Sequence, residues 1–183
     1  MMGGRRESTV TMSLIVLMSD FGVEDNYVGV MKGVMKNINP DADIIDLNHN
    51  IEPQNIKQAG FCLSGSYKFF PKGTIFVCVV DPGVGSERKI ILLKTKKHYF
   101  IAPDNGIISD VVKNEKVEKI TWVNNGKYFL TPVSNTFHSR DIFSPVSGWL
   151  SLGTDINKFG PAITIENIVK IRYNKPYRRE NIC

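Results

Sequence analysis

Two short segments of the sequence concentrate residue types that can bind and move a proton. In VVDPGVGSERK, Asp81 directly follows an apolar run, and Arg88 comes seven positions later, after a turn rich in glycine. In FHSRDIF, His138 precedes a serine, an arginine and an aspartate. A carboxylate paired with a guanidinium, close to an imidazole, could hold a water molecule and accept its proton. A plain turn with a local salt bridge would explain the first segment equally well.

The second segment also has a local explanation. Asp141 could cap the helix that follows, Arg140 could pair with it, and His138 could be a buried, satisfied imidazole. Beside an Asp–Arg pair, the histidine becomes a candidate base or proton shuttle. The other two histidines are weaker candidates: we expect His98, in a lysine-rich turn, to be solvated, and His49 has no second histidine at metal-ligand spacing. We therefore predict no metal site.

Polar residues follow three of the predicted strands. Asp20 follows the first, Asp81 the third, and Asp104 and Asn105 a later one. In open α/β sheets, ligands bind outside the carboxyl ends of the strands. An ionised carboxylate placed there can accept hydrogen bonds from both hydroxyls of a ribose. One such aspartate more often makes a turn or a helix cap, but three in one chain favour a ligand site.

The elements that must position these residues alternate between strand and helix. Continuous apolar runs predict strands over residues 13–19, 42–48 and 73–80. Apolar residues at helical spacing predict helices over 25–37 and 56–69. This β-α-β-α-β order predicts an α/β fold with a mostly parallel sheet flanked by helices.

Asp25 is the candidate N-cap of the first of these helices. The later part of the chain has a less regular pattern. We expect short strands over 89–95, 97–103 and 117–123, a short helix over 107–112, a hairpin-like turn at 124–128, a helix over 141–150, a loop at 152–161 and strand material over 163–177.

Composition is that of a soluble globular protein, with 42% hydrophobic and 22% charged residues and a net charge of +5. Cys62 and Cys78 lie in apolar runs and no CxxC pair occurs, which suits a reducing cytoplasm. No apolar run reaches membrane-span length, so we expect no membrane partner. We also expect no nucleic-acid partner, and we interpret the late basic residues as a solvated end; they are Lys170, Arg172, Lys175, Arg178 and Arg179.

Five segments carry a family resemblance. In order, they are SDFGVEDNYVGVMKGVM, INPDADIIDLNHNIEPQNI, FFPKGTIFVCVVDPGVGSERK, IAPDNGI and SNTFHSRDIFSPV. Together they resemble the S-adenosylmethionine hydroxide adenosyltransferase family, which comprises S-adenosylmethionine hydrolases related to fluorinase and chlorinase. The resemblance spans about Leu14 to Arg172, and its most specific motifs are DPGVGSxR, PDNG and TFHxRDIF.

The resemblance implies a Rossmann-like N-terminal domain that cleaves S-adenosylmethionine to adenosine and methionine, with water attacking C5′ of the ribose. It implies that Asp81, Arg88 and His138 position and activate that water, and that Asp20 binds the ribose diol. No metal and no cofactor is expected, because the leaving group is a neutral thioether that needs no general acid. The full set of expected substrate-binding residues is Asp20, Phe21, Asp104, Asn105, Phe137, Ser139 and Arg140.

Two positions bear on the choice of nucleophile. The fluorinase branch carries a tyrosine where this chain has Asp81, so the aspartate favours transfer of hydroxide over halide. The family usually has glycine where this chain has Ser139, whereas halogenating relatives carry a serine there that contacts the halide. Chloride therefore stays open as an alternative to water.

The expected organisation is a disordered extension over residues 1–11, a catalytic α/β domain over 12–160, and a connector over 161–183. Family members continue into a C-terminal β-barrel and assemble as homotrimers, in which the neighbouring barrel supplies adenine contacts. We expect that barrel to be absent from this chain. Two alternatives stay open: an inactive nucleoside-binding or assembly module, and a metal-dependent phosphoester hydrolase that uses the aspartates at the strand ends.

Overall fold

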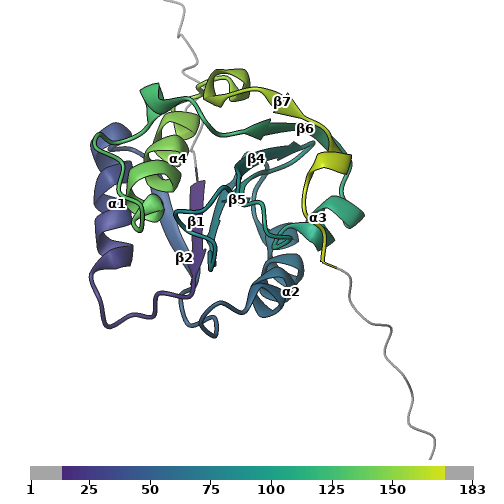
Figure 1. The fold of residues 1–183 in the computed structure, drawn as a ribbon, viewed down its shortest axis with the longest axis horizontal. Helices are drawn as coiled ribbons and strands as arrows, with labels where there is room; N and C mark the ends of the chain where they lie inside the picture. Colours follow the sequence, from purple (N-terminus) through teal and green to yellow (C-terminus); the bar gives the residue numbers. More distant parts are fainter. Residues whose placement is uncertain (1–13, 172–183) are drawn as a thin grey trace, which may run out of the picture.

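A seven-stranded sheet forms the centre of the computed structural model, which describes residues 14–171 (Figure 1). In spatial order its strands are β2, β1, β3, β5, β4, β6 and β7. The strands β2, β1, β3 and β5 are parallel neighbours, whereas β4 and β7 run against the others. The α/β fold is thus confirmed, but the sheet is mixed: three of its strand pairs are parallel and three are antiparallel. The strands are β1 (Leu14–Ser19), β2 (Asp43–Asn48), β3 (Ile75–Val79), β4 (Ile90–Thr95), β5 (Tyr99–Pro103), β6 (Val117–Trp122) and β7 (Ala162–Ile163).

Helices cover both faces of this sheet (Figure 1). On one face lie α1 (Tyr27–Ile38) and α4 (Ser144–Ser151), and on the other lie α2 (Ile56–Ser66) and α3 (Ser109–Asn114). A π-helical segment, Ser139–Phe143, leads directly into α4. Each face therefore has its own hydrophobic core.

The central strands are continuous apolar runs because both of their faces are covered. Along β1, Leu17 packs with the buried side chains of α1 and α4, and the next residue, Met18, packs with those of α2. Every residue of β3 is buried. The methionines Met31 and Met35, four positions apart on α1, bring the buried stripe of that helix onto the sheet.

The order in which successive strands join the sheet reverses at β1, because β2 and β3 lie on opposite sides of it. From β1 the chain passes through α1 to β2 on one side, and then through α2 to β3 on the other side of β1. Ser19 pairs in register with Val79, so the carboxyl ends of β1 and β3 lie side by side. Such a topological switch point opens a crevice at the strand ends. Asp20 and Asp81 follow these two strands and therefore reach the same crevice.

Three expectations about local structure are wrong. Asn26, and not Asp25, precedes α1, and no side-chain hydrogen bond caps that helix. Residues 124–128 form no hairpin turn but contain a 3-10 turn, Gly126–Tyr128, because β6 pairs with the distant β7. The expected strand over 163–177 is reduced to Ala162–Ile163, followed by a 3-10 turn; residues beyond 171 lie outside the described part.

His98 is buried and not solvated, with only 2% of its surface exposed. Its ring packs edge-on against Tyr67, Phe76 and Phe100, and Nε2 lies 3.1 Å from the carbonyl oxygen of Phe70. The neighbouring lysines mislead because Lys96 and Lys97 are exposed in the turn, whereas His98 is buried directly before β5 begins.

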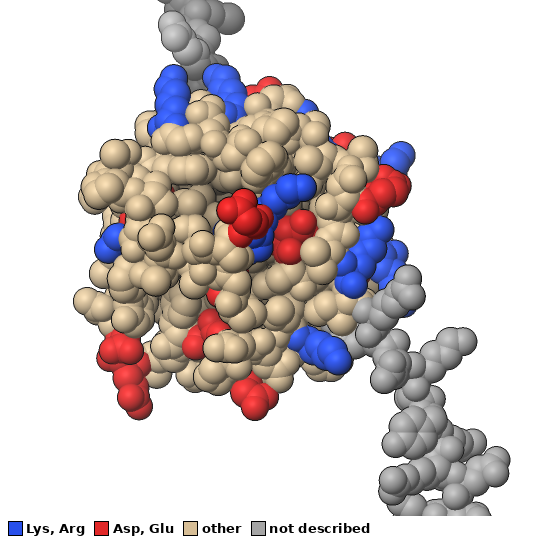
Figure 2. Space-filling view, viewed as in Figure 1, with Lys and Arg blue, Asp and Glu red and all other residues tan. Residues whose placement is uncertain are grey.

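In the described part of the chain, every helix is too short or too polar to cross a membrane. The face shown in Figure 2 carries both acidic and basic side chains, some of them adjacent to each other, on a largely uncharged surface. The proposed extension over residues 1–11, and the late basic residues from Arg172 onward, lie outside the described residues.

Candidate active site

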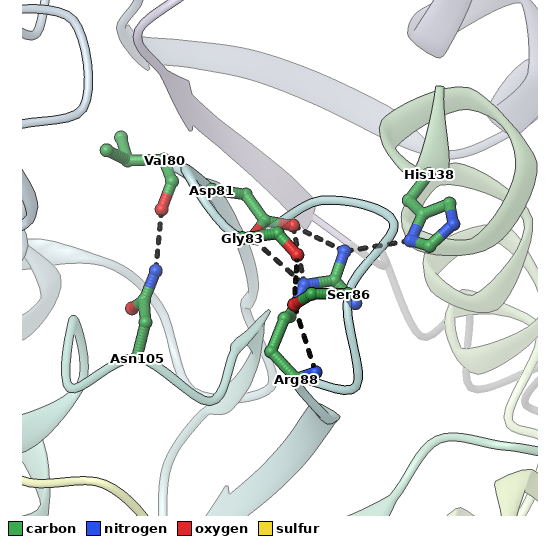
Figure 3. Close-up of polar contacts among 7 residues, drawn as sticks. All are labelled: Val80, Asp81, Gly83, Ser86, Arg88, Asn105 and His138. Carbon is green, nitrogen blue, oxygen red and sulfur yellow. Dashed lines mark hydrogen bonds and ion pairs between the residues drawn. The ribbon is translucent and has the colours of Figure 1, made fainter. Parts of the chain in front are cut away.

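Asp81, Arg88 and His138 meet at the carboxyl end of β3 (Figure 3). Nε of Arg88 donates to both oxygens of the Asp81 carboxylate, at 2.9 and 2.8 Å, and Nη2 donates to Oδ2 at 2.5 Å. The same Nη2 lies 2.8 Å from Nδ1 of His138. The side chains of the ion pair are 5% and 11% exposed, so the guanidinium bridges the carboxylate and the imidazole out of bulk solvent.

The hydrogen bond to Arg88 determines the state of His138. A guanidinium has only donors, so Nδ1 must be the acceptor and the neutral ring carries its proton on Nε2. Burial and the positive charge of Arg88 lower the pKa of His138 below its ordinary value, against the opposing effect of Asp81 and Asp141. The imidazole is therefore neutral near pH 7 and supports the guanidinium from the side opposite Asp81.

The glycine-rich loop between Asp81 and Arg88 brings them together. Ser86 closes it by donating its hydroxyl to the carbonyl oxygen of Gly83 at 2.7 Å (Figure 3). Gly85 has a φ of +78°, and a Cβ at this position would lie 2.5 Å from the carbonyl oxygen of Asn135. Only glycine fits this close approach between the loop and the segment that leads to His138.

A cavity of about 350 Å³ lies beside this cluster and falls within the usual size range of small-molecule sites. Asp20 and Asp81 both line it, one from each strand of the switch point. Oδ2 of Asp20 accepts the backbone N–H of Gln54 at 2.8 Å, and its other oxygen has no hydrogen-bond partner among the described residues. The complete lining is Asp20, Phe21, Pro53, Gln54, Val79, Asp81, Pro82, Val84, Thr136 and Ser139.

Asp104 and Asn105, two of the predicted binding residues, bind backbone groups and do not line this cavity. Asn105 donates from Nδ2 to the carbonyl oxygen of Val80 at 2.8 Å and so fixes the residue before Asp81 (Figure 3). Asp104 faces elsewhere, because its carboxylate accepts the backbone N–H of Val169 at 2.8 Å. Burial raises the pKa of Asp104, against the weaker effects of that hydrogen bond and of Lys89.

Phe137 and Arg140 lie outside the cavity lining. The ring of Phe137 stacks on Tyr27 at a centroid distance of 5.8 Å, and the guanidinium of Arg140 lies 5.2 Å from the centre of the Phe137 ring. Arg140 also pairs with Asp141, with Nε at 2.6 Å from Oδ1. Burial alone would raise the pKa of Asp141, but hydrogen bonds from Arg140 and from the backbone of Ser134 outweigh it and lower that pKa.

Six lining residues were not predicted as site residues: Pro53, Gln54, Val79, Pro82, Val84 and Thr136. Gln54 has a φ of +64°, the left-handed region that residues other than glycine rarely adopt. Its N–H points to Asp20 as a result. The loop after β2 was a detectable candidate, because it follows the carboxyl end of a parallel strand.

A larger cavity, of about 740 Å³, opens near the start of β3 and β5, where Ile75 and Tyr99 line it. It contains none of the residues of the Asp81 cluster, so size alone does not identify the site. Within residues 14–171, no three histidine, cysteine, aspartate or glutamate side chains gather closely enough to hold a metal ion.

The match to a family model covers residues 15–160 and is described as "SAM hydroxide adenosyltransferase N-terminal domain". The (R)-S-adenosyl-L-methionine hydrolase of Methanocaldococcus jannaschii is 39% identical over 140 residues, which are 74% of this chain and 52% of the relative. A fluorinase from an Actinoplanes species is 27% identical over 89% of this chain and 62% of the relative.

One solved structure is similar to this chain in both fold and sequence. The crystal structure of an uncharacterized conserved protein from Thermotoga maritima has a TM-score of 0.85 and 40% sequence identity, over 90% of this chain and 64% of that one. The chain thus spans about half to two thirds of the length of these relatives. With the family model matching most of its length, the chain belongs to the SAM hydroxide adenosyltransferase family, through the N-terminal domain.

Proposed function

We propose that this protein hydrolyses S-adenosylmethionine to adenosine and methionine by attack of water on C5′ of the ribose. One observation carries the proposal: the Asp81 carboxylate, held by Arg88, lines the same cavity as the half-free carboxylate of Asp20. The relatives named as hydrolases of this substrate support it.

The proposed mechanism gives each of these groups one role. The free oxygen of Asp20 binds the ribose hydroxyls and sets the sugar in the cavity. A water molecule near Asp81 forms the new C5′–O bond while the C5′–S bond breaks, and the bonding electron pair leaves with sulfur as a neutral thioether. The proton of the water passes to the Asp81 carboxylate and then to solvent. Holding the water in line with the C–S bond is the main remaining requirement.

His138 has a different role from Asp81 in this mechanism. Its Nδ1 is occupied by the Arg88 hydrogen bond, so that nitrogen is not available to accept a proton from water. We assign it to positioning: it fixes Arg88, and Arg88 fixes Asp81 through both carboxylate oxygens.

Incubation with S-adenosylmethionine in ¹⁸O-labelled water, followed by chromatography with mass detection, tests the proposal. We expect labelled adenosine and methionine, with or without a chelator. Asp81→Asn should lower turnover by about 10²-fold or more, as for loss of a positioned acid–base group. Asp43→Asn, an exposed aspartate at the start of β2, is the matched control and should leave turnover unchanged. Binding without turnover by the folded parent would favour the inactive module, and loss of activity on chelation would favour the metal-dependent hydrolase.

Chloride is the second candidate nucleophile because of Ser139. This residue is 8% exposed, lines the cavity, and makes no side-chain hydrogen bond among the described residues. Its hydroxyl is therefore available to an anion. A 5′-chloroadenosine product that appears with added chloride and disappears in Ser139→Gly would establish this role.

Assembly is also part of the proposal. We propose a homotrimer, on the basis of the family resemblance, and multi-angle light scattering of the purified chain measures its mass. A monomer at all concentrations would contradict it.

A further inference from the structure

A chain of four polar side chains runs from the surface of α1 to the end of β1. Nζ of Lys32 lies 2.5 Å from Oδ2 of Asp46, and Oδ1 of Asp46 lies 3.0 Å from Nε2 of His49. Nδ1 of His49 lies 2.7 Å from the hydroxyl of Ser19. His49 and Ser19 are 5% and 1% exposed, so the inner half of this chain is buried. The proposed catalytic cycle uses none of the four.

The donors and acceptors of this chain fit together in only one direction. Oγ of Ser19 accepts the backbone N–H of Phe21 at 3.3 Å, so its own proton is free to go to Nδ1 of His49. The ring then carries its proton on Nε2 and donates it to Asp46, which also accepts from Lys32.

The carboxylate of Asp46 is suited to this arrangement. Burial acts to raise its pKa, but hydrogen bonds from Lys32 and His49 and their charges outweigh that effect and lower it. The carboxylate stays ionised at neutral pH and selects the Nε2–H form of the ring.

His49 holds the turn that follows β1 from two sides. Its ring binds Ser19, and its backbone carbonyl oxygen accepts the N–H of Gly22 at 2.8 Å. Between these two anchors lie Asp20 and Phe21, and both line the cavity. The turn therefore cannot shift without breaking a contact to His49.

We propose that His49 is a positioning residue for Asp20, acting through the Ser19 hydroxyl and oriented by Asp46. This inference rests on the proposed function, in which Asp20 binds the ribose. It predicts that His49 controls affinity for the nucleoside and contributes little to the chemical step, because Asp81 reaches the cavity from the end of a different strand, β3, and is held there by Arg88.

The first test compares two substitutions of His49. His49→Leu removes both ring nitrogens and should raise KM for S-adenosylmethionine about tenfold, with kcat changed less than threefold. His49→Asn keeps an oxygen that can accept from Ser19 and should recover most of that loss. His98→Leu, a buried histidine in the aromatic cluster, is the control and should lower stability without changing KM. An unchanged KM in a folded His49→Leu variant would overturn the inference. So would a decrease in kcat as large as the increase in KM, if it occurs in both variants.

The second test does not depend on turnover. ¹⁵N NMR of the parent should show His49 as the neutral Nε2–H tautomer, and Asp46→Asn should weaken that preference. In His49→Leu, the amide protons of Phe21 and Gly22 should exchange with solvent at least tenfold faster, while amides of β3 keep their rates. An Nδ1–H tautomer of His49, or unchanged amide exchange of Phe21 and Gly22, would overturn the proposed positioning role of His49. If these NMR results are as expected but the parent shows no hydrolysis, the proposed function fails and the structural role of His49 stands.

Discussion

Replacing Arg88 by methionine should leave the buried charge of Asp81 without a partner and so lower the stability of the protein. Three N–H···O contacts join the pair, and the two side chains are 5% and 11% exposed. Removing one partner of a buried ion pair costs about 3–5 kcal/mol, because the remaining charge is left without compensation. A domain with a total stability of about 5–15 kcal/mol would lose a large share of it. Urea unfolding at pH 7.5, followed by the fluorescence of Trp122 and Trp149, measures the loss.

A double-mutant cycle separates this effect from lost packing. Asp81→Asn removes the charge, so Arg88→Met should cost less in that background, with a coupling energy of about 2–3 kcal/mol. The pair Lys94–Glu118 is the control, at 3.2 Å but 37% and 40% exposed, and Lys94→Met should cost less than about 1 kcal/mol. A loss of under about 1 kcal/mol for Arg88→Met, or a coupling near zero, would refute the reasoning.

Three further predictions follow from the site. Because the pKa of His138 lies below 6.5, as a result of burial and a neighbouring guanidinium, kcat/KM should be level above about pH 7 and fall only at lower pH. The folded state binds this proton more weakly than the unfolded chain, so the free energy of unfolding also decreases as the pH falls through 6.5. A decrease in kcat/KM already between pH 8 and pH 7 would contradict the assignment of a neutral His138. Gly85→Ala should destabilise the protein by at least about 1–2 kcal/mol and reduce turnover, because its φ is +78° and the new Cβ would meet Asn135. Gly33→Ala, in α1 with no atom near the added Cβ, should stabilise by about 0.4–1 kcal/mol in the same thermal melts, and equal effects of the two would argue against the close approach. Asp20→Ala should weaken adenosine binding by about tenfold or more in calorimetry, and an unchanged affinity would remove it from the ribose site.

The sequence was sufficient to predict the layers of the fold and the part of the site formed by Asp81 and Arg88. Continuous apolar runs identified β1 and β3, because a strand that is buried on both faces has apolar residues at nearly every position. The spacing of Asp81 and Arg88 predicted their ion pair because the intervening glycines can adopt the backbone conformations that a tight turn requires.

The parts that were missed depend on contacts between distant segments. Gln54 reaches the cavity through a left-handed backbone conformation, which its residue type does not indicate. Asp104 had the right position after a strand, but Val169, sixty-five positions later, occupies its carboxylate. His98 was predicted to be solvated from its lysine neighbours, whereas the aromatic rings that bury it come from three other elements. No local pattern contains this information.

The order of strands at the switch point has a consequence for synthesis on the ribosome. In the sheet, Ile15 of β1 pairs with Ile75 of β3, which comes 60 positions later in the chain. At about 5–20 residues per second, a nascent β1 waits roughly 3–12 seconds for the neighbour that covers its second edge. During that interval an almost wholly apolar strand is accessible to other chains. Chaperone supply and translation speed between residues 20 and 75 should therefore govern the yield of soluble protein.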